Sequence, residues 1–228
     1  MSSQYYVQPE NLKNGFFSLD ERESAHASRV MRLRIGDKIR LFDGEGRKYE
    51  AVIEETGKIV IGKIAAELAP ENPPKLKLTL CFAPGDRKAC EDIVDKCTQL
   101  GVAVFQPVIT ERTQGGRKVD SAKWRTVSIQ SCKQCERARL PEFLAPLDFK
   151  EAFSDGKPAV LAWENAAGSP LPPAGRTGKL KLFIGPEGGF TDGEVEFAVK
   201  SGAETVSLGK NVLRAETAAI AACAFILL

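Results

Sequence analysis

Two glycine turns near the carboxyl terminus constrain this chain most, because each joins a strand-like run to a helix-like run. The first lies within Phe183–Phe190 (FIGPEGGF) and follows the strand-like run Lys179–Ile184. The second lies within Ser207–Ala218, between a short strand over Glu204–Leu208 and an apolar helix over Ala215–Leu228. Glycine lets a backbone approach a ligand closely, and ligands of open α/β sheets lie at the carboxyl ends of strands. The pattern therefore predicts that both turns line one pocket.

Strand-like and helix-like runs alternate from residue 76 onward, which is typical of a parallel sheet with helices on both faces. Thr191 and Glu194 have the spacing of a capping box and predict a helix start at Thr191. We expect strands over 76–82, 102–109, 159–163 and 179–184, helices over 87–100 and 120–139, and an exposed loop over 168–178.

The amino-terminal part is expected to be a small β-rich domain. Alternating polar and apolar residues predict strands over 37–42, 49–53 and 58–64, preceded by a short helix over 26–32. The proline-rich run at 69–75 breaks the pattern. We therefore place the domain boundary there and expect domains over 1–70 and 71–228.

The charge distribution allows a nucleic-acid partner without requiring one. The net charge is only +2, but residues 29–48 carry seven Lys or Arg against three acids. Residues 112–139 carry eight against two. Such stretches suit phosphate binding, although ordinary surface charge explains them as well.

The sequence favours neither a membrane nor a metal partner. The first ten residues are polar, and no run approaches the ~20 apolar residues of a membrane span. Cys132-x-x-Cys135 has no second such pair, and His26 is the only histidine. Structural zinc needs four ligands. We expect reduced thiols, a structural hydrogen bond for His26, and a cytoplasmic location.

The paired turns resemble the SPOUT class of RNA methyltransferases. By Ile184–Gly189 (IGPEGG), Leu208-Gly209 and Leu213–Ala218 (LRAETA), the chain is identified as a member of the RsmE family. That family methylates N3 of a uridine in 16S rRNA of the small ribosomal subunit. The resemblance implies a trefoil knot within about 158–228, preceded by a PUA-like β-barrel domain that binds RNA. It also implies S-adenosylmethionine as cofactor and a homodimer.

The resemblance extends over nearly the whole chain, with departures in the middle. Gly85-Asp86-Arg87, Thr110-Glu111-Arg112 and Leu140-Pro141-Glu142 follow the family order. Asp95 stands where glutamine is usual, Lys133 where glutamate is usual, and Glu136 where glycine is usual. These positions lie outside the two glycine turns. They therefore leave the exact RNA target open, whereas the expected methyl-transfer chemistry is unaffected.

The resemblance also implies the site residues. Arg214 is the candidate catalytic residue, because a cation near O2 or O4 would stabilise the charge that develops on uracil. Glu187 or Glu216 could balance the positive sulfonium, and no general base is identified. Arg29, Arg32, Arg112 and Arg137 are the candidate RNA contacts. The candidate cofactor contacts are Leu161, Ile184, Gly185, Glu187, Gly188, Gly189, Leu208, Gly209, Leu213, Glu216, Thr217 and Ala218.

Other enzyme classes fit poorly. The chain has no G-x-x-x-x-G-K-[ST] of a P-loop, and no G-x-G-x-x-G follows a strand. A serine hydrolase would have to use His26, which lies in the other domain. Two alternatives stay open: a SPOUT methyltransferase that acts on another RNA nucleotide, and a non-catalytic dimeric RNA-binding protein.

Overall fold

The computed structural model describes residues 4–69, 72–114, 119–166, 171 and 175–228. The chain forms two compact units. One contains Met1–Asn72 and Ile129–Leu140, and the other contains Pro73–Ser128 and Pro141–Leu228. The predicted boundary at residues 70 and 71, and most of the loop predicted over 168–178, lie outside the described residues.

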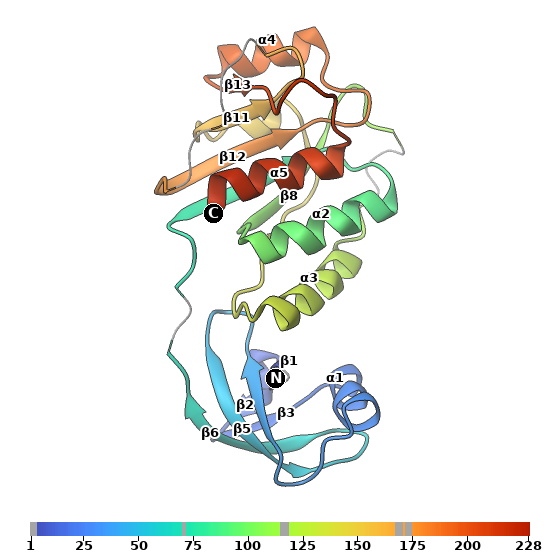
Figure 1. Ribbon diagram of the computed structural model, residues 1–228, viewed down its shortest axis with the longest axis vertical. Helices are drawn as coiled ribbons and strands as arrows, with labels where there is room; N and C mark the ends of the chain where they lie inside the picture. The colour runs from blue at the N-terminus through green and yellow to red at the C-terminus, as the bar shows by residue number, and fades with distance from the viewer. Residues whose placement is uncertain (1–3, 70–71, 115–118, 167–170, 172–174) are drawn as a thin grey trace. The chain divides into compact units, whose positions relative to one another are not determined.

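The first unit is built on a curled, mixed six-stranded sheet (Figure 1). Its strands are β1 (Gln4–Tyr6), β2 (Leu12–Lys13), β3 (Phe16–Ser18), β4 (Lys38–Phe42), β5 (Lys48–Glu55) and β6 (Ile61–Glu67), in the order β1-β4-β5-β6-β3-β2. Only β1 and β4 pair in parallel. Tyr49, Ala51 and Ile53 alternate into the core along β5, as the sequence pattern predicts. Closure of this sheet into a barrel stays a prediction.

A helix precedes β4, but it begins earlier than predicted. Helix α1 (Glu21–Ala25) starts at Asp20, whose carboxylate accepts a hydrogen bond from the Glu23 amide at 2.7 Å. It continues into the π-helical turn η2 (His26–Val30). The predicted range of 26–32 therefore missed the first turn, because the Asp20 N-cap lies outside the apolar pattern.

His26 lies beside a buried ion pair in this unit. The Lys133 ammonium contacts the Glu23 carboxylate at 2.8 Å, and both side chains are more than nine-tenths buried. Burial lowers the pKa of His26, and the charge of Lys133 lowers it further. His26 Nδ1 has no hydrogen-bond partner among the described residues. The structural hydrogen bond expected for His26 stays a prediction.

The second unit contains a seven-stranded sheet in which every pairing is parallel. Its strands are β7 (Leu76–Phe82), β8 (Val104–Ile109), β9 (Glu142–Phe143), β10 (Leu147–Asp148), β11 (Ala159–Ala162), β12 (Gly178–Ile184) and β13 (Glu204–Val206). The order is β10-β8-β7-β12-β11-β13, and β9 also pairs with β8. The predicted α/β class with a parallel sheet is confirmed.

Helices cover both faces of this sheet (Figure 1). Successive strand residues point to opposite faces, so Leu80 packs on one side and Cys81 on the other. The first core contains α2 (Arg87–Leu100) and α5 (Ala215–Leu227), and the second contains α4 (Asp192–Lys200) and the short helix η3 (Glu151–Phe153). The helix α2 has the predicted bounds: Asp86 caps its start and Gly101 follows its end.

Helix α3 (Ser121–Cys135) ends four residues before the predicted end at Arg139. The next residue, Glu136, has φ +60°. This left-handed conformation breaks the helical hydrogen-bond ladder, and glycine adopts it with the least strain. The glycine that is usual at this position in the family therefore has a physical explanation.

Replacing Glu136 with glycine should stabilise the first unit by about 0.5–1 kcal/mol, because relief of left-handed strain exceeds the added chain entropy. The ion pair lost with Arg40, at 3.6 Å between exposed side chains, contributes little. The measurement is urea unfolding. Glu136→Ala is the matched control, since it removes the ion pair and keeps the strain. Equal midpoints for the glycine and alanine variants would contradict the explanation.

Candidate functional site

Three parallel strands of the second unit bring their carboxyl ends together. Strand β11 lies between β12 and β13 in the sheet, pairing Ala162 with both Ile184 and Val206. The chain then leaves β12 through the turn 185–190 and leaves β13 through the turn 207–214. Both turns therefore start at the same edge of the sheet, as the sequence pattern predicts.

Short-range hydrogen bonds stabilise both turns. At the start of α4, the Thr191 hydroxyl accepts from the Glu194 amide at 3.2 Å, and the Glu194 carboxylate accepts from the Thr191 amide at 2.9 Å. This is the predicted capping box. The second turn contains a local hydrogen bond, in which the Gly209 amide donates to the Ser207 hydroxyl at 3.4 Å.

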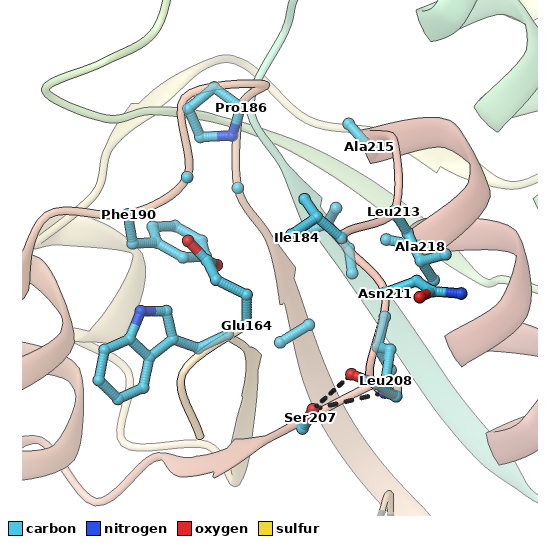
Figure 2. Close-up of a pocket in the computed structure, with 16 residues that line it drawn as sticks. Glu164, Ile184, Pro186, Phe190, Ser207, Leu208, Asn211, Leu213, Ala215 and Ala218 are labelled. Atoms are coloured by element: carbon cyan, nitrogen blue, oxygen red, sulfur yellow. Dashed lines mark hydrogen bonds between the residues drawn. The ribbon is translucent and has the colours of Figure 1, made fainter. Parts of the chain in front are cut away.

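The two turns and the end of β11 line one pocket, shown in Figure 2. Glu164 and Phe190 lie on one side of it, and Leu208, Leu213 and Ala218 lie on the other. Of the described residues that line the pocket, only Glu164 has a titratable side chain. The lining residues are Ala162, Trp163, Glu164, Ile184, Gly185, Pro186, Gly189, Phe190, Ser207, Leu208, Gly209, Asn211, Val212, Leu213, Ala215 and Ala218.

The pocket wall has no room for a side chain at Gly189. This residue has φ +67°, and a Cβ atom there would lie 2.9 Å from Glu164 Oε1. At Gly185, a Cβ atom would lie 3.1 Å from the Phe190 ring. The backbone of the first turn therefore forms this part of the wall itself, and a ligand can approach it closely.

Seven of the predicted cofactor contacts line this pocket: Ile184, Gly185, Gly189, Leu208, Gly209, Leu213 and Ala218. Five others do not. Leu161 is fully buried in the core that contains Phe183, whereas Glu187, Gly188 and Thr217 are exposed and Glu216 is half-buried. Arg214 is exposed at the N-cap of α5, beside lining residues on both sides.

Sequence reasoning missed the segment Ala162–Glu164. These residues follow β11 directly, so the rule for strand ends could have identified them. The sequence does not reveal that β11 pairs with both β12 and β13, since the three strands are not in chain order across the sheet. Phe190 and Asn211 lie in the two turns and line the pocket, but the sequence pattern indicated mainly the glycines of these turns.

A further loop supports the first turn from the end of β8. The Glu194 carboxylate accepts from the Glu111 amide at 2.9 Å, and the Arg112 guanidinium donates to the Gly188 carbonyl at 2.6 Å. Arg112 thus contacts the glycine turn in this structure. Arg29 and Arg32 are exposed in the first unit, where Arg137 is half-buried and its carbonyl accepts from Gln4 at 3.2 Å.

The thiols and acids do not form a metal centre in the described part of the chain. No group of three or more His, Cys, Asp or Glu residues there has the arrangement of a metal site. Cys132 is buried among Tyr6, Phe42 and Ala138. Of the helices that the structure describes, none has the length and apolarity needed to cross a bilayer.

Comparison with protein families identifies the class of both units. Residues 71–227 match a family described as an RNA methyltransferase domain, and residues 19–64 match one described as an RNA methyltransferase PUA domain. The second match lies within the β-rich unit, and the first includes the whole pocket. A PUA domain beside a parallel-sheet methyltransferase domain defines an RNA methyltransferase.

Individual relatives narrow this class. The ribosomal RNA small subunit methyltransferase E of Synechocystis sp. is 31% identical, over 98% of this chain and 77% of the relative. The Rickettsia conorii protein of the same name is 29% identical, over 96% of this chain and 92% of the relative. The crystal structure of the Neisseria gonorrhoeae protein of this name, bound to S-adenosyl methionine, has 30% identity and a TM-score of 0.86, covering 98% of this chain and 96% of that one. The chain belongs to the ribosomal RNA small subunit methyltransferase E family.

Proposed function

We propose that this chain methylates N3 of a uridine in 16S rRNA of the small ribosomal subunit and takes the methyl group from S-adenosylmethionine. The observation that carries the proposal is the pocket that the two glycine turns form with the end of β11, the strand between β12 and β13. The Neisseria relative, 30% identical, was crystallised with this cofactor. When bound, the cofactor supplies a methyl group activated by a sulfonium.

The pocket residues fit such a cofactor by their chemistry. Ile184, Leu208 and Leu213 offer apolar surface, and at Gly189 no side chain of the residue itself stands between the backbone and a ligand. Among the described residues that line the pocket, Glu164 is the only carboxylate. We therefore add it to Glu187 and Glu216 as a group that would offset the sulfonium charge. The remaining predicted contacts stay proposals for a cofactor-bound state.

Arg214 is proposed to stabilise the acceptor. Uracil N3 lies on the Watson–Crick edge, so the target base must be unpaired or extruded before it enters the site. Arg214 stands exposed between the lining residues Leu213 and Ala215, where its guanidinium can reach a base held at the pocket mouth. A donor aimed at O2 or O4 would stabilise the anion that forms when N3 loses its proton.

RNA binding is proposed for Arg29, Arg32, Arg112 and Arg137. Arg29 and Arg32 lie exposed in the unit that matches the PUA domain, which supports phosphate contacts there. A protein that acts on the small ribosomal subunit works in the cytoplasm, and the proposal includes that location. The domains are proposed to divide at residues 70 and 71.

A homodimer and a trefoil knot within about 158–228 complete the proposal. Exposed side chains along one stripe of α5 include Phe225, 54% exposed, and Leu228, 82% exposed. Ala221, at the same helical spacing, extends the stripe. An exposed apolar stripe of this kind suits a partner surface, and family membership supports a second copy of the chain as that partner.

Calorimetric titration of S-adenosylmethionine into the purified protein tests the cofactor site. We expect saturable binding with one cofactor per chain or one per dimer. A folded protein that binds small-subunit rRNA but gives no cofactor signal would favour the non-catalytic RNA-binding alternative and would overturn the proposal.

Glu164→Gln should weaken S-adenosylmethionine binding by roughly fivefold and S-adenosylhomocysteine binding by less than about twofold. The reason is that only the first ligand carries the sulfonium charge, and partly exposed charge pairs contribute on the order of 1 kcal/mol. Calorimetry with both ligands measures the difference. Equal losses for the two ligands would show that Glu164 contacts a part that they share, such as the ribose.

A further inference from the structure

A second hollow lies at the opposite edge of the parallel sheet. Leu78, Leu80 and Leu180 point into the core formed with α2 and α5. The alternate residues of these strands, such as Thr79 and Lys181, point to the other face. The hollow lies on that face, along the amino-terminal halves of β7, β8 and β12. Its charged residues are Lys77, Lys157, Lys179, Lys181, Glu142, Glu151 and Asp155, and we call this hollow the lysine cleft.

The inner lysine of the cleft already has partners. The Lys181 ammonium, in a side chain 10% exposed, contacts Asp155 Oδ1 at 2.8 Å and the Ala152 carbonyl at 2.6 Å. Lys157 contacts the other Asp155 oxygen at 2.6 Å. Burial raises the pKa of Asp155, but hydrogen bonds from Lys157 and Lys181 outweigh it and lower the pKa to about 2. Asp155 is therefore ionised and neutralises part of this charge.

The two outer lysines, Lys77 and Lys179, do not share the Asp155 carboxylate with Lys157 and Lys181. Lys77 and Lys179 stand directly opposite each other on neighbouring strands, whose backbones lie about 4.8 Å apart. Both are exposed, and neither forms an ion pair with a described residue. Of the two remaining acids, the Glu151 carboxylate accepts from the Asp148 amide at 3.1 Å, and Glu142 is exposed at the rim. Two like charges on paired residues repel each other, and a bound anion would offset this cost.

We propose that the lysine cleft binds a backbone phosphate of the RNA substrate through Lys77 and Lys179. This inference rests on the proposed function, which supplies RNA as the partner. The Thr79 hydroxyl, in the same cleft, can donate a further hydrogen bond to a phosphate oxygen. Lys179 and Ile184 are five residues apart on β12, or about 16 Å. A few nucleotides of one strand span that distance, so one RNA can reach both edges of the sheet.

The test is the salt dependence of RNA binding by the full chain carrying Lys77→Gln and Lys179→Gln. Each phosphate contact that is lost reduces the slope of log affinity against log salt by about 1. We expect a slope reduced by about 1 to 2 and affinity at low salt reduced at least about tenfold. Lys88→Gln with Lys200→Gln is the matched control, because these exposed lysines lie on helices and already pair with Asp92 and Glu196. The control should keep the wild-type slope.

An unchanged slope in the Lys77 and Lys179 variant would overturn the inference. Inorganic phosphate provides the second arm: if it binds the wild type and not the variant while the RNA slope stays the same, the cleft takes free phosphate, and the RNA assignment is wrong. Cofactor affinity separates this inference from the proposed function. Normal S-adenosylmethionine binding with an unchanged slope rejects only the cleft, whereas a wild-type chain without cofactor binding rejects the enzyme.

Discussion

Replacing Gly189 with valine should weaken S-adenosylmethionine binding by roughly 10-fold to 100-fold. Valine is a β-branched residue and tolerates the φ of +67° at this position poorly. Its Cβ atom would also lie 2.9 Å from Glu164 Oε1, and the flexible Glu164 side chain would have to turn away. The backbone strain is on the order of 1–3 kcal/mol, which corresponds to roughly a 10-fold to 100-fold loss of cofactor affinity if the turn changes conformation to relieve it.

The matched control is Gly193→Val in the first turn of α4. A Cβ atom at Gly193 meets nothing within 4 Å, and its φ is not positive. This variant should retain wild-type affinity within about twofold, because valine has a higher helix propensity than glycine and α4 is kept. Calorimetry on both variants, with circular dichroism to verify folding, measures the effect. Equal affinities of Gly189→Val and Gly193→Val would contradict the assignment of the wall.

Arg214→Ala should reduce methyl transfer by about 100-fold to 1000-fold while cofactor affinity stays within a few-fold. The magnitude is that of removing one donor from a charge-stabilising site. Arg214 forms no side-chain cap on α5, so alanine leaves the helix start in place. Single-turnover transfer from labelled cofactor separates the chemical step from binding.

Arg214→Lys tests whether charge alone suffices. Lysine keeps the positive charge but loses the planar pair of donors, so an intermediate rate is expected. Loss of cofactor binding in Arg214→Ala, with RNA affinity intact, would assign Arg214 to the cofactor instead. A normal turnover rate would remove it from the mechanism.

The elements predicted most accurately from the sequence are those whose ends are marked by neighbouring residues. Helix α2 has the predicted bounds because Asp86 and Gly101 mark its ends and its apolar residues recur at helical spacing. The capping box at Thr191 likewise depends on two residues of one turn. Strands β2, β9 and β10 contain two residues each, too few to show a pattern, and they exist only through tertiary pairing.

The site was predictable in part for the same reason. The glycine turns are local signals, so seven of the twelve predicted cofactor contacts do line the pocket. Glu164 could not be singled out, because its place in the wall depends on β11 lying between two strands that follow it in the chain. The early end of α3 depends on Glu136, whose left-handed conformation no propensity of glutamate predicts.

Methyl transfer to the small ribosomal subunit tests the central claim most directly. Purified protein would be incubated with labelled S-adenosylmethionine and with undermethylated small-subunit particles or naked 16S rRNA. The nucleosides would then be separated by chromatography and identified by mass spectrometry. The account predicts label in 3-methyluridine at one position, and none with Arg214→Ala at matched times. Label in another base or in a ribose, or no label despite cofactor and RNA binding, would contradict it.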